Sequence, residues 1–343
     1  MGIKPAEVQG VRAFIKAVAS YLPKKIEVNE ATRITKKIGI ISRHVVENEE
    51  CASDLAYSAA EKLLSNYPME RKLIDFVILC TQSPDFFLPT TACILQSRLG
   101  LSKQCGAFDF NQGCSGYVYG LSMAKGLIET GQATHVLLLA AETYSKYVHP
   151  EDNTVRPIFG DAATATLISA ENTEVDGLYA FQFGTDGSGA KHLIVPAGAS
   201  RNPAFRTPIK EHVDKYSNRR TNYNFFMNGA AVIDFALDVV PQTVSQILAK
   251  AQIAKEQVDY FIFHQANKFM LKLLQQKCDL QESPFWNNVE TTGNTVSSTI
   301  PLAIEAVLRE KDPSELPVVM VVGFGVGLSW AGCLVDLSHM LHD

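Results

Sequence analysis

The chain has 343 residues, of which 46% are hydrophobic and 20% are charged, and its formal net charge is −5. This length suits one large or two ordinary domains with a sizeable core. Because the chain is acidic and its Lys and Arg residues are dispersed, nothing in the charge favours a nucleic acid or an anionic membrane as partner. We see no signal segment, no apolar run long enough to span a bilayer and no metal-binding cysteine spacing, so we expect a cytoplasmic protein without a metal site.

The first third of the chain predicts alternating strands and helices. Residues 10–21 show near-strand spacing, and residues 35–46 read as irregular structure that passes into a strand. A helix is predicted over residues 52–64 and a second one over residues 91–99. Between them, residues 74–81 form an almost continuous apolar run, typical of a strand that is covered on both faces.

The stretch Phe108-Asp-Phe-Asn-Gln-Gly-Cys114 holds the most informative cysteine. A strand-like run ends there, and apolar residues at helical spacing over 118–128 predict a following helix. Cys114 would then lie at a helix N-terminus, where free N–H groups and the helix dipole favour the thiolate. Gly113 and Gly116 would leave room for a substrate carbonyl. The alternative is a buried structural cysteine, because free cysteines are commonly buried.

The remaining elements continue the same alternation. We predict strands over 135–141, 159–168, 258–263 and 317–323, helices over 225–249, 270–277 and 300–309, and a long surface loop over 191–221. Pro241 is expected to break the first of these helices. The strand over 258–263 leads directly into His264.

The two halves of the chain repeat each other. Matching segments are 74–81 with 258–265, the helix start at 113–115 with that at 293–295, and 135–141 with 317–323. The repeat predicts an α/β fold of two similar halves, residues 1–171 and 172–343, with parallel sheets covered by helices. Ligand sites of such sheets lie at the carboxyl ends of the strands. We therefore expect Cys114, His264 and Asn294 to meet.

Together these three side chains can perform acyl chemistry. Cysteine is an intrinsically strong nucleophile. His264 could accept its proton or polarise a bound carbonyl, and the Asn294 amide could donate to a developing oxyanion. Taken singly, a strand-end histidine and a helix-capping asparagine are ordinary structural residues. The Gly-rich stretch 323–327 reads as a tight turn at the site, since no βαβ unit follows it.

At these residues the sequence resembles the β-ketoacyl-[acyl carrier protein] synthase III family, within the thiolase-like superfamily. The resemblance covers nearly the whole chain. It rests on Ala107-Phe-Asp-Phe-Asn-Gln-Gly-Cys114-Ser-Gly, Phe159-Gly-Asp161-Ala, His264-Gln-Ala-Asn267, Gly293-Asn294-Thr295 and Gly323-Phe-Gly-Val-Gly327-Leu-Ser-Trp330. It implies the duplicated five-layer αβαβα fold with mixed, mainly parallel sheets, and a homodimer.

The resemblance also implies a ping-pong mechanism in fatty acid biosynthesis. Cys114 would take an acyl group from an acyl-CoA or acyl-carrier protein. His264 and Asn294 would then hold the thioester carbonyl of malonyl-carrier protein while CO2 leaves, and the carbanion would attack acyl-Cys114. Backbone N–H groups of Cys114 and Val326 would form the oxyanion hole. No cofactor is implied, since CoA and phosphopantetheine thioesters are substrates.

Five further residues match substrate-binding positions of that family: Leu88, Phe159, Asn267, Phe324 and Gly325. Leu88 matches the position that reaches into the acyl pocket of the partner subunit. Its size and that of its neighbours would limit the length of the acyl chain.

The sequence departs from the family pattern mainly where the acyl donor would be recognised. Near the nucleophile, Gly113 precedes Cys114 where the family usually has alanine, and Val326 occupies a position where the family usually has glycine. The insert that carries a tryptophan against the CoA adenine is missing between Tyr21 and Lys37. Gly39-Ile40-Ile41 replaces the family's Gly-Ile-Arg, and Phe269 takes the place of a basic residue. These departures favour a carrier-bound or unusual acyl donor over ordinary CoA recognition.

Other functions use the same residues or the same fold. A non-decarboxylating acyltransferase would pass the acyl group of Cys114 to an alcohol or amine. A chalcone-type synthase also uses Cys, His and Asn, but the short chain and the His-Gln-Ala-Asn motif argue against it. A thiolase needs a second catalytic cysteine, and Cys333 reads as core. A non-catalytic scaffold would not need all three of Cys114, His264 and Asn294.

Overall fold

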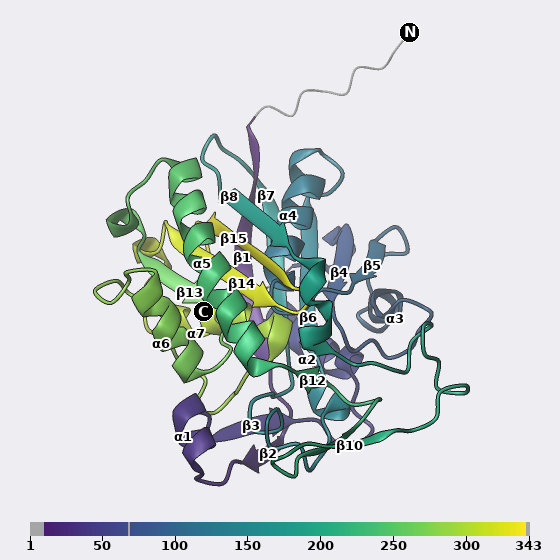
Figure 1. Cartoon of the computed structure of the whole chain (residues 1–343). Coiled ribbons are helices and arrows are strands. Elements are labelled where there is room, and N and C mark those ends of the chain that lie inside the picture. The colour runs from purple at the N-terminus through teal and green to yellow at the C-terminus, as the bar shows by residue number, and fades with distance from the viewer. Residues whose placement is uncertain (1–9, 68, 341–343) are drawn as a thin grey trace.

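Two mixed β-sheets form the centre of the chain, and Figure 1 shows them flanked by helices in a computed structural model that describes residues 10–67 and 69–340. The N-terminal sheet has the order β1 (Val11–Tyr21), β7 (Ala162–Asn172), β6 (His135–Glu142), β4 (Phe76–Cys80), β5 (Gly106–Phe110). Strand β4 runs parallel to β5 and β6, whereas β7 pairs antiparallel with β6 and β1.

The C-terminal sheet repeats this arrangement. Its order is β13 (Tyr260–Phe263), β14 (Val319–Gly325), β15 (Ser329–Val335), β8 (Leu178–Thr185). Strands β13 and β14 are parallel, and β15 pairs antiparallel with β14 and β8. An isolated parallel bridge between Phe261 and Phe285 stands where a fifth strand would correspond to β5. Parallel and antiparallel strand pairs follow one another in the same order in both sheets, which confirms the duplication that the sequence predicts.

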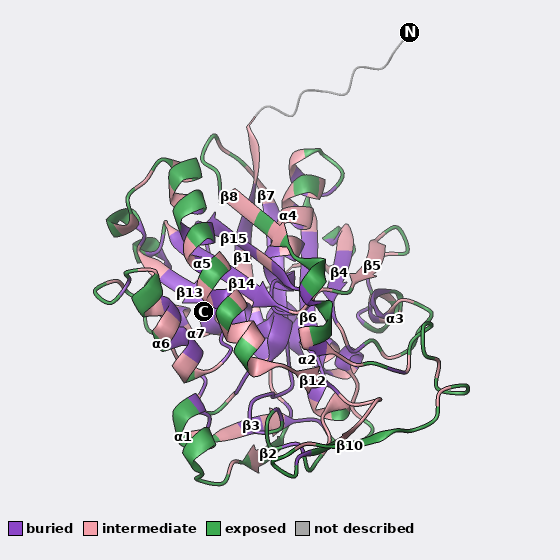
Figure 2. Ribbon diagram, viewed as in Figure 1, coloured by how far each residue is buried: buried purple, intermediate pink, exposed green. Residues whose placement is uncertain are grey.

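Helices form the other three layers. They are α2 (Ala52–Asn66) and α3 (Thr91–Arg98) outside the N-terminal sheet, α4 (Gly116–Glu129) and α7 (Thr299–Leu308) between the sheets, and α5 (Gly229–Ala251) with α6 (Lys268–Lys277) outside the C-terminal sheet. Figure 2 shows the strands of both sheets mostly buried, with exposed residues on the outer helices. Burial on both faces explains why β4 and β14 read as continuous apolar runs.

Smaller elements complete the chain. The short strands are β2 (Lys25–Val28) paired with β3 (Ser42–Val45), β9 (Leu193–Ile194) with β12 (Phe226–Met227), and β10 (Glu211–Val213) with β11 (Arg219–Thr221); the short helix is α1 (Arg33–Ile38). Turns of 3₁₀ helix are η1 (Arg71–Leu73), η2 (Tyr144–Tyr147), η3 (Gly187–His192), η4 (Lys255–Gln257), η5 (Val296–Ser298) and η6 (Pro313–Glu315).

The structure corrects the expectation of irregular backbone in the first part of 35–46. Helix α1 forms because Thr32 and Thr35 cap its start reciprocally, with Thr35 N–H donating to the Thr32 hydroxyl at 3.1 Å and Thr32 N–H donating to the Thr35 hydroxyl at 2.8 Å. Gly39, at φ 71°, ends the helix in the left-handed conformation. Only six residues lie between these caps, too few for a clear apolar stripe.

Pro241 does not break α5, contrary to the sequence prediction. The helix continues through it because buried residues on both sides, Ala236 and Val244 among them, pack on the C-terminal sheet. By length and composition α5 could also cross a membrane, which corrects the expectation that no apolar run is long enough. Its buried face packs against β8, β14 and β15, as in a core helix.

Strands β2 and β8 were not predicted, because neither shows a clean alternating pattern.

Candidate active site

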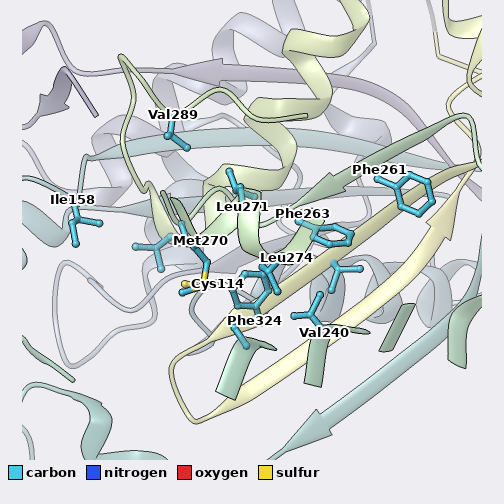
Figure 3. Packing of buried hydrophobic residues seen from close by; sticks show 14 of the residues in the cluster. Cys114, Ile158, Val240, Phe261, Phe263, Met270, Leu271, Leu274, Val289 and Phe324 are labelled. Atoms are coloured by element: carbon cyan, nitrogen blue, oxygen red, sulfur yellow. The ribbon is translucent and has the colours of Figure 1, made fainter. Parts of the chain in front are cut away.

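Cys114 lies in the short loop between β5 and α4, as its sequence context predicts. The residue is buried and belongs to the apolar cluster that surrounds Phe324 (Figure 3). A Cβ on Gly113 would lie 2.4 Å from Val326 Cγ1, and one on Gly116 would lie 2.3 Å from Cys80 Sγ. The two glycines therefore permit close packing around the loop, rather than the approach of a substrate that the sequence suggests.

The environment of the Cys114 sulfur stabilises the thiol more than the thiolate. Burial, and next the charge of Glu142, raise the pKa of Cys114 to about 12. Backbone hydrogen bonds from Cys114 and Val326 act in the opposite direction. Desolvation of the sulfur therefore outweighs the stabilisation of the thiolate that we expected from the helix terminus. The same two N–H groups are those predicted for an oxyanion hole, and both reach the sulfur.

His264 follows the last residue of β13, and its backbone N–H donates to the Val322 carbonyl at 2.8 Å. The ring is buried, with Nδ1 2.7 Å from the Thr299 hydroxyl and its centroid 5.4 Å from that of Phe324. Burial lowers the pKa of His264 to about 3, only partly offset by a backbone hydrogen bond with Val296. The ring is therefore neutral at physiological pH and has one donor and one acceptor nitrogen.

Asn294 is fixed by its backbone and by its side-chain oxygen. Its N–H donates to the Ile158 carbonyl at 2.9 Å, and its own carbonyl accepts from Gly160 at 3.0 Å, in a parallel bridge with Phe159. Its Oδ1 accepts from the Val296 N–H at 2.9 Å. Since the oxygen is occupied in this way, the amide Nδ2 is the group left to donate to a ligand.

A chain of contacts joins the three predicted catalytic residues. The turn over 294–299 links Asn294 to His264, because the Thr299 hydroxyl lies 3.0 Å from the Val296 carbonyl and also contacts His264. Phe324 packs its ring against that of His264. The next residue, Gly325, is so close to the nucleophile that a Cβ on it would lie 2.8 Å from Cys114 Sγ. The structure therefore brings Cys114, His264 and Asn294 into one buried region.

Glu142 is a buried carboxyl group that sequence reasoning missed. It accepts hydrogen bonds from Ser297 Oγ at 2.9 Å, Gln82 N–H at 3.0 Å and Ser83 Oγ at 3.2 Å. Burial raises the pKa of Glu142 to about 8, despite these bonds. Its position directly after the apolar run of β6 is the same kind of signal that identified His264. It ties the N-terminal half to the turn that carries Asn294.

The predicted substrate-binding residues separate into three groups. Phe159, Phe324 and Gly325 lie beside the catalytic residues, as described above. Asn267 caps α6, where its Oδ1 accepts from the Met270 N–H at 2.9 Å. The side chain of Leu88 is 82% exposed on the surface, so the chain does not bring Leu88 to its own site.

A cavity of about 670 Å³ opens between β2, α1 and the loop over 153–157. At its base Glu27 pairs with Arg43 at 2.9 Å and with Arg156 at 3.2 Å. Buried Arg43 also donates to the Phe159 carbonyl at 3.1 Å. A smaller cavity of about 120 Å³ shares these three charged residues and is also lined by Phe159. The smaller cavity therefore adjoins Phe159, the residue that pairs with Asn294 in an isolated bridge.

Comparisons with known proteins point to a single family. The family models described as 3-oxoacyl-[acyl-carrier-protein (ACP)] synthase III and its C-terminal part match residues 108–187 and 248–337. A beta-ketoacyl-[acyl-carrier-protein] synthase III from Caldanaerobacter subterraneus subsp. tengcongensis is 31% identical over 96% of this chain and 98% of its own.

Two solved structures show the same similarity in three dimensions. A 3-oxoacyl-(acyl-carrier-protein) synthase III is 48% identical, with a TM-score of 0.91 over 95% of this chain and 99% of that one. A 3-oxoacyl-(acyl-carrier protein) synthase from Burkholderia xenovorans LB400 is 36% identical, with a TM-score of 0.88 over 97% of this chain and 95% of that one.

Proposed function

The chain belongs to the 3-oxoacyl-[acyl-carrier-protein] synthase III family, and we propose that it joins an acyl group to malonyl-carrier protein by a decarboxylating condensation in fatty acid biosynthesis. The observation that carries the proposal is the buried contact chain that links Cys114, His264 and Asn294 across the two halves. A nucleophile, a neutral imidazole and a neutral amide donor are the groups that two successive acyl transfers through a thioester require.

In the first half-reaction Cys114 attacks the carbonyl carbon of an acyl thioester. His264 accepts the thiol proton, which is needed because the raised pKa of Cys114 keeps the sulfur protonated. The N–H groups of Cys114 and Val326 stabilise the oxyanion that forms. The donor thiolate leaves and takes up a proton, and the acyl group stays on Cys114.

In the second half-reaction malonyl-carrier protein loses its carboxylate as CO2. The electron pair of the broken C–C bond becomes an enolate, whose oxygen accepts hydrogen bonds from His264 and from Asn294 Nδ2. The enolate carbon then attacks the acyl carbon, the 3-oxoacyl thioester leaves with the carrier, and Cys114 is expelled as a thiolate that takes up one proton. Neutral donors suit this step, because they stabilise the enolate without holding the carboxylate as an ion pair.

The acyl donor is proposed to be an acyl-carrier protein or an acyl-CoA, entering through the cavity beside Glu27. Glu27 offsets the charge of Arg43 and Arg156 there, which favours a donor with fewer phosphates than CoA. This agrees with the sequence departures at the same end of the molecule.

We also propose that the protein is a cytoplasmic homodimer and that each subunit contains both of the similar halves. Phe87 and Leu88 expose 85% and 82% of their surface in the loop before α3. Adjacent exposed apolar side chains of this size are typical of a surface that another chain covers. Leu88 would then contribute to the acyl pocket of the partner subunit.

The experiment that tests the proposed function follows Cys114 by intact-protein mass spectrometry. The protein is incubated with a panel of acyl-CoA and acyl-carrier thioesters and then with malonyl-carrier protein. We expect a stable acyl adduct that disappears as CO2 and a 3-oxoacyl product form. An adduct that persists with malonyl-carrier protein, but clears with an alcohol or amine, would replace this proposal with a non-decarboxylating acyltransferase.

A further inference from the structure

The hydroxyl group of Thr299, the first residue of α7, lies between two groups that can accept its proton. It is 2.7 Å from His264 Nδ1 and 3.0 Å from the Val296 carbonyl oxygen. Thr299 is buried, so neither contact competes with bulk water. One hydroxyl carries one proton, and therefore it donates to only one of these acceptors at a time.

Each choice fixes a different tautomer of the neutral ring. When Thr299 donates to the Val296 carbonyl, its oxygen accepts from Nδ1–H, and His264 Nε2 is left as a bare acceptor. When Thr299 donates to Nδ1, the ring proton must reside on Nε2, which is then a donor. The proposed function needs both states of His264, since acylation requires a proton acceptor at Nε2 and decarboxylation requires a donor there.

Thr299 also lines a cavity of about 380 Å³, and neither His264 nor Phe324 is among the residues that line it. Its lining includes Thr299 itself, Thr295, Gln265 and Gly293, the last three being sequence neighbours of His264 and Asn294. The hydroxyl of Thr295 is buried and has no hydrogen-bond partner within residues 10–67 and 69–340. A buried hydroxyl without a protein partner in a cavity of this size is a site for ordered water.

The charged outer rim connects this cavity to solvent. Lys62 and Arg309 both pair with Glu305, at 2.8 Å and 3.0 Å, and all three side chains line the cavity. This rim and Thr299 line the same cavity, which shares no lining residue with the cavity at Glu27. Acyl-Cys114 and the incoming thioester would therefore leave it open.

We propose that Thr299 is a positioning residue that switches His264 between its two tautomers, exchanging protons with water in the cavity behind it. This inference rests on the proposed function. During acylation Nε2 takes the proton of the Cys114 thiol, and the donor thiolate takes up a proton from solvent as it leaves. Once Cys114 is acylated, Nδ1 gives its proton through the Thr299 oxygen to cavity water. The ring is again neutral and now carries its proton on Nε2.

The condensation reverses this transfer. The enolate is stabilised by Nε2–H, and the expelled Cys114 thiolate then takes that proton. Nδ1 regains a proton from cavity water through Thr299. Summed over both half-reactions the enzyme takes up one proton from solvent, which is the proton that the release of CO2 from a carboxylate requires.

Three variants test this route. Thr299→Val keeps the shape of the side chain but removes the hydroxyl, and Thr299→Ser keeps the hydroxyl. Ala303→Leu fills part of the cavity one turn further along α7. In T299V the ring keeps its backbone hydrogen bond with Val296, and Nε2 can still accept the Cys114 proton, so acylation should continue at close to the wild-type rate. Condensation should fall by about 100-fold, the lower end of the contribution of a positioned proton donor or acceptor. T299S should restore it, and A303L should slow condensation alone.

The tautomer itself can be observed by NMR of protein labelled with 15N in the histidine rings, with His264 assigned from its loss in His264→Gln. We expect a proton on Nδ1 alone in T299V and an exchange between both nitrogens in the wild type. Equal ring shifts in the two proteins, or a T299V variant in which both half-reactions keep their rates or fall together, would overturn the proposal. If the wild type releases no CO2, the proposed function fails instead, and the NMR comparison still tests Thr299.

Discussion

Gly325→Ala should slow acylation of Cys114, because the added methyl group would crowd the nucleophilic sulfur. A Cβ at this position would lie 2.8 Å from Cys114 Sγ and 3.0 Å from Cys114 Cβ. Heavy atoms pack at about 3.5–4.0 Å, so the nucleophile must move by roughly 1 Å. A displacement of this size in a reacting group costs on the order of 100-fold in rate, or about 2.7 kcal/mol of barrier.

The assay is the rate at which the acyl adduct on Cys114 appears, measured by mass spectrometry after rapid mixing with the best donor. Gly126→Ala is the matched control, because Gly126 lies in α4 and a Cβ there meets nothing within 4 Å. The control should acylate at the wild-type rate and gain roughly 0.5–1 kcal/mol of stability from its helical alanine. If folded G325A acylates as fast as G126A, the close approach of β14 to the nucleophile is not what positions the sulfur.

Three further predictions concern other parts of the molecule. Folded Glu142 keeps its proton up to about pH 8, while an unfolded glutamate loses its proton near pH 4.5, so the free energy of unfolding falls as pH rises between these values. In urea titrations from pH 5 to 9, Glu142→Gln should therefore show a smaller fall in the free energy of unfolding than the wild type. Equal falls in the two proteins would contradict the raised pKa of Glu142. Arg43→Met should destabilise the fold by about 1–3 kcal/mol, because the buried Phe159 carbonyl loses its donor, and an unchanged urea midpoint would refute this contact. Leu88→Glu should shift the protein toward monomer in sedimentation without altering monomer stability by more than about 0.5 kcal/mol, and an unaltered dimer would remove Leu88 from the proposed interface.

The positions of the main site residues could be predicted because each one follows a buried strand or begins a helix in a repeated unit. His264 comes directly after β13, and the glycine before Asn294 matches the one before Cys114. The parallel strand pairs of each half then fix which ends meet. Glu142 obeys the same rule, but a carboxylate at a strand end has so many ordinary explanations that its sequence position alone is not informative.

Other features depend on contacts between segments far apart in the chain. The packing role of Gly113 depends on Val326, and the buried position of Cys114 reverses the effect that the helix terminus alone would have on its pKa. The contact between Thr299 and His264 joins residues 35 positions apart. Likewise, Pro241 is tolerated inside α5 only because the sheet beneath holds both parts of the helix. Local patterns do not contain this information.

We propose that Cys114 performs the acyl transfer and that Asn294, with His264, serves the decarboxylation. The most direct test compares the two half-reactions in Asn294→Ala. We expect acyl-Cys114 to form at nearly the wild-type rate and to persist after malonyl-carrier protein is added. CO2 release should fall by about 10²- to 10³-fold, the loss typical of one oxyanion donor. If acylation and CO2 release fell together, or if N294A released CO2 at the wild-type rate, this division of roles would be wrong.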